Sequence, residues 1–415
     1  MGKSDSWDIA IEKPPRSSSN SDSQSVILKP GEIYTNDKGL GWFVTALFVV
    51  GNLAGGGIVA LPTALIQTEV WPGLAIQVVM TALTTFTAYV LGRTWAILLD
   101  RWPEYREHTR KPYAEIGFRS LGVYMRNAVS VTMAITQFMI GVVYILLSSK
   151  NIHDFIKAFF GANVSFCLVI LALAVCLLPV MFLKSPHDFW WAVVIAMMTT
   201  SAAVILVIIG TAFDYGTCSP HSKLPEAKAT NFFLALGTML FAYGGHTAFP
   251  TIQHDMRRPH DFTKSAFLAF AILAIMYTPM SIFGYLSYGD SLRESIINSV
   301  QNKGVQQTIN ILITVHLILA LTIVFNPIYQ EVEEVFRVPQ HFSWQRVCVR
   351  AGILVGAVFV AESVPSFGPL LNLVGGSTLT LTSIVYPCLF YMFLDTRNKM
   401  IERYGSDPGV PSVHE

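Results

Sequence analysis

The chain has 415 residues and a formal net charge of +1, and 52% of its residues are hydrophobic while only 13% are charged. The balanced charge gives no sign of a nucleic-acid or acidic partner, and so apolar a composition excludes an ordinary soluble globular protein. Four of the five cysteines lie in or beside apolar segments, so no disulfide framework is expected. Composition therefore indicates an all-α polytopic membrane protein.

The two ends of the chain are polar. Residues 1–38 contain eight serines and no apolar run, which predicts a disordered cytoplasmic tail without a cleavable signal. Residues 39–395 form the predicted transmembrane domain, and residues 396–415 a cytoplasmic C-terminal tail. The first apolar helix is then expected to direct the chain to the membrane.

Ten apolar stretches are long enough to cross a bilayer, which requires about 20 residues per helix. In chain order they are 42–66, 73–99, 123–149, 165–183, 189–213, 230–252, 265–287, 305–329, 347–364 and 377–394. The loops that share a side with the N-terminal tail hold 16 Lys and Arg residues, whereas the loops on the other side hold 6. Because cytoplasmic loops are enriched in positive residues, both termini are predicted to be cytoplasmic.

The first and sixth stretches are interrupted in the same way. Gly57 precedes Pro62 by five residues and Gly245 precedes Pro250 by the same interval, and the offset is 188 residues in both cases (245−57 and 250−62). The same offset carries helix two onto helix seven and helix five onto helix ten. This pattern predicts a five-plus-five inverted repeat with helices one and six broken, and a transporter-type binding site between the breaks. Close helix packing through small residues is the alternative interpretation.

The residues at the breaks suit an amino acid. Three consecutive glycines permit an unwound turn with free amides, and the half-helix that follows directs its positive end at the break, where a carboxylate would bind. Carbonyls before the glycines of helix six would accept hydrogen bonds from an ammonium group. Gln137 and Tyr144 lie seven residues apart, on one face of helix three, and would line the same pocket. The predicted substrate-binding residues are Gly55, Gly56, Gly57, Ile58, Phe241, Ala242, Tyr243, Gly244, Gln137 and Tyr144.

Several motifs resemble those of the amino acid/auxin permease family, over residues of about 39 to 395. They are the Gly-Gly-Gly-Ile-Val-Ala-Leu-Pro run of residues 55–62, the segment 241–253, Asn326-Pro327, and residues 373–377. The resemblance implies a LeuT-like five-plus-five fold and amino-acid transport coupled to H+ or Na+. Family members usually have an eleventh helix, whereas this chain continues after Leu394 as a polar segment.

Candidates for ion coupling are polar groups near the breaks. His246 is suited to carry a proton, and Asn52 would offer oxygen to sodium, helped by Thr322 or Asn326. His316 is a weaker candidate, because its own helix is not broken nearby. Hydrogen bonding between helices is the alternative for all of these groups. No resident cofactor or metal is expected.

No P-loop, nucleophile elbow or metal-ligand spacing occurs, so an enzyme is not expected. The favoured function is a monomeric secondary transporter of small amino acids, in the plasma membrane or, second, an endolysosomal or vesicular membrane. A nutrient sensor with the same fold, signalling through its serine-rich tail, is the alternative. Asn163 begins a glycosylation sequon on the predicted outer side, and Glu331, Glu333 and Glu334 are expected to pair with arginines of the inner loops.

Overall fold

The computed structural model describes residues 34–37, 39–107, 109–181, 190–221, 228–339, 341 and 343–404. Most of the predicted N-terminal tail, and the C-terminal residues 405–415, therefore lie outside the described residues. Within them the chain is helical throughout, apart from turns and one isolated bridge between Leu40 and Met256. The expectation of an all-helical chain is confirmed for these residues.

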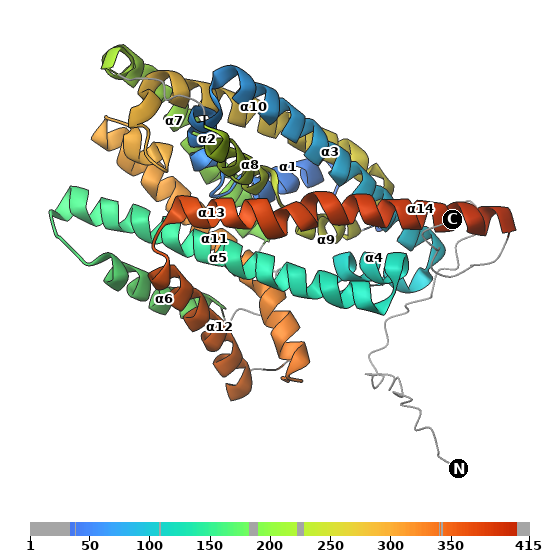
Figure 1. Ribbon diagram of the computed structural model, residues 1–415. Coiled ribbons are helices and arrows are strands. Elements are labelled where there is room, and N and C mark those ends of the chain that lie inside the picture. Colours follow the sequence, from blue (N-terminus) through green and yellow to red (C-terminus); the bar gives the residue numbers. More distant parts are fainter. Residues whose placement is uncertain are drawn as a thin grey trace. The chain divides into compact units, whose positions relative to one another are not determined.

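Each of the ten predicted stretches coincides with a helix or a pair of helices (Figure 1). The α-helices are α1 (Trp42–Leu53), α2 (Leu61–Thr68), α3 (Val70–Arg101), α4 (Pro112–Leu121), α5 (Val123–Phe160), α6 (Phe166–Met181), α7 (Trp190–Cys218), α8 (Ala229–Tyr243), α9 (Phe249–His254), α10 (Phe262–Tyr288), α11 (Lys303–Val335), α12 (Trp344–Ser363), α13 (Phe367–Val374) and α14 (Tyr386–Tyr404). Short 3-10 turns, among them η1 (Ile58–Ala60) and η5 (His246–Ala248), connect several of them.

Not every helix meets the length and hydropathy of a membrane span. Among the described residues seven helices do, and an eighth is counted when the bent pair Trp42–Leu53 and Ile58–Thr68 is taken as one span. The helix Phe166–Pro179 is apolar but shorter. Several helices of this length and hydropathy are typical of a polytopic membrane protein.

The helix of the tenth stretch begins earlier than predicted, at Phe367 and not at residue 377. From there the chain continues through two π-helical turns, Gly375–Leu379 and Leu381–Val385. A Cβ atom on Gly375 would collide with the carbonyl oxygen of Gly237 in α8. Glycine is therefore needed at residue 375 because two backbones approach closely, and the helix does not end there. Figure 1 shows α13 and α14 as one continuous rod beside α5.

The segment before α1 is fixed to the segment after α9. The amide of Arg257 donates to the carbonyl of Leu40 at 2.8 Å, and the amide of Leu40 donates to the carbonyl of Asp255 at 2.9 Å. The amide of Asn36 donates to the carbonyl of Arg257, also at 2.9 Å. The start of one broken helix is thereby held to the end of the other.

The acidic cluster at the end of α11 is paired with basic residues of other elements. Glu333 accepts from Arg346 and Arg350 at 3.1 and 2.6 Å, as expected for the inner-loop arginines. Glu331 and Glu334 instead contact Lys111, at 2.7 and 2.8 Å. These contacts join α11 to α12 and to the start of α4.

Replacing Lys111 with methionine is expected to lower the free energy of unfolding by about 0.5–1 kcal/mol near neutral pH. Burial by itself would lower the pKa of Lys111, but hydrogen bonds and charges from Glu331 and Glu334 outweigh it and raise the pKa. A raised pKa means that this stability is fully present below the unfolded pKa, about 10.4, and is lost as pH rises through the folded value. Thermal unfolding of the wild type and of Lys111→Met, measured from neutral pH to above about pH 10.4, checks the direction of this pH dependence. The exposed Lys303→Met is the control. A stability difference that grows above pH 10.4 would contradict it.

Candidate functional site

Both predicted breaks are present and have the same local structure. Helix one ends at Leu53 and resumes at Ile58, with a bend of 57° between its halves. Helix six ends at Tyr243 and resumes at His246. In each case a three-residue 3-10 turn is followed by an α-helix with proline at its second position, and the turns are 188 residues apart (246−58). Proline is tolerated there because the first amides of a helix have no intrahelical partner.

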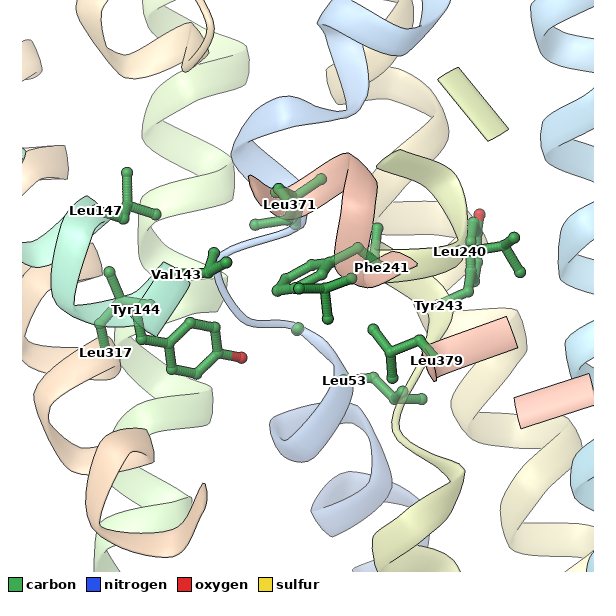
Figure 2. Packing of buried hydrophobic residues seen from close by; sticks show 14 of the residues in the cluster. Leu53, Val143, Tyr144, Leu147, Leu240, Phe241, Tyr243, Leu317, Leu371 and Leu379 are labelled. Carbon is green, nitrogen blue, oxygen red and sulfur yellow. The ribbon is translucent and has the colours of Figure 1, made fainter. Parts of the chain in front are cut away.

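The two breaks lie against each other. A Cβ atom on Gly57 would be 2.7 Å from Cα of Ala242, so the backbones are in direct contact. The side-chain amide of Asn52 donates to the carbonyl of Gly245 at 3.3 Å. The unwound segment of helix one passes between the rings of Tyr144 and Phe241 (Figure 2). The predicted meeting of helices one and six is therefore present.

Tyr277 of α10 joins the two breaks and was missed from the sequence. Its hydroxyl lies 3.2 Å from the carbonyl oxygen of Leu53 and 3.1 Å from that of Ala242, and it donates to both. The side chain is fully buried. The only signal in the sequence was a tyrosine within an apolar helix, whose hydroxyl needs a partner.

The amides of Gly55, Gly56 and Gly57 differ in their hydrogen-bond partners. The amide of Gly55 donates to the carbonyl of Leu53 at 2.7 Å, so the expectation that all three amides are free is wrong for this residue. The amide of Gly56 interacts with the hydroxyl of Tyr144. Among the described residues the amide of Gly57 has no backbone partner. Gly57, with Gly56 beside it, is therefore best placed to bind an anion.

Close contact explains why these positions are glycine. A Cβ atom on Gly55 would collide with the hydroxyl of Tyr144, and one on Gly56 would lie 3.2 Å from its ring. Of the positive φ angles recorded for glycines, none falls in this run. Glycine is thus required here by the approach of side chains and backbone, and not by a left-handed conformation.

The helix-six residues are buried in the last turn of α8. The ring of Phe241 faces the unwound segment of helix one (Figure 2), and Ala242 forms its backbone contact. The hydroxyl of Tyr243 accepts from Thr81 of α3 at 2.9 Å, so this side chain is directed away from the break. Ile58, at the start of η1, is fully buried, and Gly244 caps α8.

One face of α5 reaches both breaks. Tyr144 contacts Gly55 and Gly56, and Gln137 donates to the hydroxyl of Thr247 in η5 at 3.3 Å. Both side chains are buried. The face of α5 that carries both residues is therefore directed at the two breaks.

The predicted ion-coupling residues are scattered. Nε2 of His246 lies 3.0 Å from the hydroxyl of Thr87 and 3.1 Å from the carbonyl of Thr84, so the ring faces α3. The hydroxyl of Thr322 donates to a carbonyl of its own helix at 2.7 Å, and Asn326 is buried one turn further on. No hydrogen bond among the described residues joins either of them to Asn52.

His316 lies closer to a break than the sequence suggested. Its Nδ1 is 3.0 Å from the carbonyl oxygen of Ala196 and 2.8 Å from the hydroxyl of Thr200, both in α7. Its Nε2 would be 3.4 Å from a Cβ atom on Gly55. The helix of His316 is unbroken, as expected, but the ring lies beside the break of helix one.

Two further predictions concern the glycosylation sequon and metal binding. Asn163 is exposed in the segment between α5 and α6. In the described part of the chain no three His, Cys, Asp or Glu residues are grouped so as to bind a metal. An oxygen-lined site for an alkali cation would use other residue types.

A polytopic membrane protein with two facing helix breaks belongs to the class of transport proteins. The family model for "Transmembrane amino acid transporter protein" matches residues 38–403, and the chain belongs to this family. The chain is similar to Amino acid transporter AVT1I of Arabidopsis thaliana, at 24% identity over 364 residues that cover 85% of each chain. It is also similar to Lysine histidine transporter-like 4 of the same plant, at 24% identity over 383 residues, 87% of this chain and 82% of that protein. The family consists of transporters and not enzymes.

Proposed function

We propose that this protein is a secondary active transporter that moves small amino acids across a membrane by alternating access, driven by a gradient of H+ or Na+. The observation that carries the proposal is the contact of the two helix breaks, joined by Gly57, Ala242 and the hydroxyl of Tyr277. Broken helices expose backbone groups within the membrane only where a cavity or a ligand satisfies them. The family and its relatives support amino acids as the substrates.

In this proposal each end of the amino acid binds one break. The amides of Gly56 and Gly57 hold the carboxylate, at the positive end of the half-helix that begins at Ile58. Carbonyls between Phe241 and Gly244 accept from the ammonium group. The substrate side chain then lies among Ile58, Phe241 and Tyr144, with Gln137 and Tyr243 at the edges. Gly55 contributes to the site because its lack of a side chain leaves room for the hydroxyl of Tyr144.

The proposed architecture is ten spans in a LeuT-like five-plus-five inverted repeat. The 188-residue offset of the two 3-10 turns supports it, as does the coincidence of each predicted stretch with a helix. The charge asymmetry of the loops supports cytoplasmic termini. The protein acts as a monomer within the bilayer, and the plasma membrane is the first choice of location, with an endolysosomal or vesicular membrane second.

The coupling cation binds near the breaks, without a resident cofactor. Asn52 and His246 are candidates because each contacts or adjoins the helix-six break. The remaining candidates are Thr322 and Asn326, both in α11. A side-chain oxygen of Asn52 would suit Na+, and an imidazole would suit H+.

Uptake into proteoliposomes tests the proposal. The purified full chain is reconstituted, and uptake of a mixture of the twenty labelled amino acids is followed under an imposed H+ or Na+ gradient. We expect accumulation above the external concentration with one of the two gradients, and exchange of internal for external amino acid without any gradient. Saturable binding with neither uptake nor exchange would contradict the proposal and would favour the nutrient-sensor alternative.

A further inference from the structure

We propose that His316 binds the coupling proton, on its Nε2 atom, and that this proton binds together with the substrate carboxylate at the helix-one break. This inference rests on the proposed function and specifies its cation. His316 was the weaker histidine candidate in the sequence, but in the structure it lies beside Gly55.

The hydrogen bonds of the ring determine which nitrogen can receive a proton. A backbone carbonyl only accepts hydrogen bonds, so the 3.0 Å contact with Ala196 requires a hydrogen on Nδ1 of His316. The hydroxyl oxygen of Thr200, at 2.8 Å, accepts from the same atom. In the neutral ring Nε2 then carries a lone pair. Among the described residues this atom has no hydrogen-bond partner.

Nε2 is directed at the break. It lies 3.4 Å from the position of a Cβ atom on Gly55, and the hydroxyl of Tyr144 lies closer still to the same point. The amides of Gly56 and Gly57 follow immediately in the chain. A proton on Nε2 would therefore place a positive charge within a few residues of the site proposed for the carboxylate. In a buried site, opposite charges attract strongly.

Few other ionisable groups compete at this position. Tyr144 is the titratable side chain of α5 that faces the ring, and α1 has none. On α7 the titratable groups lie in the last turns, far from Thr200, and η8 (Ile296–Ser299) has none. Further groups on the elements packed against α11, and on α11 itself, lie toward the helix ends: Tyr124, Arg126, Lys150, His153, Asp154, Lys157, Cys167, Cys176, Asp214, Tyr215, Cys218, Lys303, Tyr329, Glu331, Glu333, Glu334, Arg346, Cys348, Arg350 and Glu362.

The attraction between proton and carboxylate produces coupling in both directions. Binding of the carboxylate raises the affinity of Nε2 for a proton, and protonation raises the affinity of the site for the amino acid by the same factor. The proton bonds to the lone pair of Nε2 on one side of the membrane and leaves the same atom on the other, so no further reactant is needed. His246 differs, because its Nε2 is already engaged by Thr84 and Thr87 of α3.

The test replaces His316 with asparagine, whose side-chain amide can still donate to Ala196 but has no group at the position of Nε2. Reconstituted wild type and His316→Asn are compared for uptake of the twenty labelled amino acids driven by a gradient of about two pH units, and for exchange without a gradient. We expect gradient-driven uptake to fall about tenfold or more, while exchange at saturating amino acid, which needs no net movement of protons, is retained. His254→Asn, which changes another buried histidine, located at the end of α9, is the control and should keep both activities.

The outcomes separate this inference from the proposed function. Unchanged pH-driven uptake in His316→Asn would overturn the inference, as would wild-type uptake driven by Na+ alone, while either result leaves the transporter standing. Absence of both uptake and exchange in wild type would overturn the proposed function itself. If His316→Asn loses exchange as well, Thr200→Val serves instead. This variant keeps the imidazole ring of His316 but removes one hydrogen-bond partner of its Nδ1 atom. We expect the pH midpoint of uptake to shift while the maximal rate is unchanged. An unchanged midpoint would count against the inference.

Discussion

Replacing Gly57 with valine is expected to reduce amino-acid uptake by roughly 10- to 100-fold, because it forces the two helix breaks apart. The new Cβ atom would lie 2.7 Å from Cα of Ala242, and a backbone atom cannot move aside as a flexible side chain can. Overpacking of this kind costs about 1–3 kcal/mol, and each 1.4 kcal/mol is about tenfold in affinity. Initial rates of uptake in proteoliposomes, with protein amounts matched, measure the effect.

Gly352→Ala provides the matched control for this substitution. Gly352 lies in α12, and no atom of the described residues is within 4 Å of the position that its Cβ atom would occupy. The control should transport at the wild-type rate. If Gly57→Val also transports normally, the two backbones do not need to touch, and the proposed substrate site is misplaced.

Replacing Tyr277 with phenylalanine is expected to weaken substrate affinity about tenfold and to lower the melting temperature. The change leaves the carbonyls of Leu53 and Ala242 without this donor. A buried polar group that loses its partner costs about 1–3 kcal/mol. Because both carbonyls belong to the breaks, the loss should appear in the KM for uptake as well as in thermal stability.

Tyr329→Phe is the control for Tyr277→Phe. Tyr329 is equally buried, and among the described residues its hydroxyl has no hydrogen-bond partner. Removing that hydroxyl should leave both KM and melting temperature near the wild-type values. A KM for Tyr277→Phe equal to that of this control would show that Tyr277 is a packing residue without a part in the site.

The breaks were predictable because their causes are local. Glycine pairs and prolines act on the helix that contains them, so Gly57, Pro62, Gly245 and Pro250 located both interruptions within a few residues. The repeat then indicated that the two would meet, since a fixed offset between halves reflects symmetry. Apolar length predicted the helices but not their ends, because helices such as α5 and α11 continue beyond their apolar stretches.

The contacts between helices were not predictable in the same way. Tyr277 and His316 lie in helices without a break, and their part in the site depends on which face of α10 or α11 is directed at helix one. When a helix is apolar on all sides, its sequence does not show which face is directed at a particular neighbouring helix. The hydrogen bond from the Gly55 amide to the Leu53 carbonyl likewise depends on the path of the unwound turn. A run of glycines permits many such paths, so the sequence does not predict this bond.

A structure of the protein with a bound amino acid is the most direct test of the central claim, that the two breaks form one substrate site. The claim predicts density for the ligand between residues 55–58 and 241–244, with its carboxylate within hydrogen-bond distance of the Gly56 and Gly57 amides. Density for a saturating amino acid at another position, with the two breaks in contact as they are here and nothing between them, would contradict it.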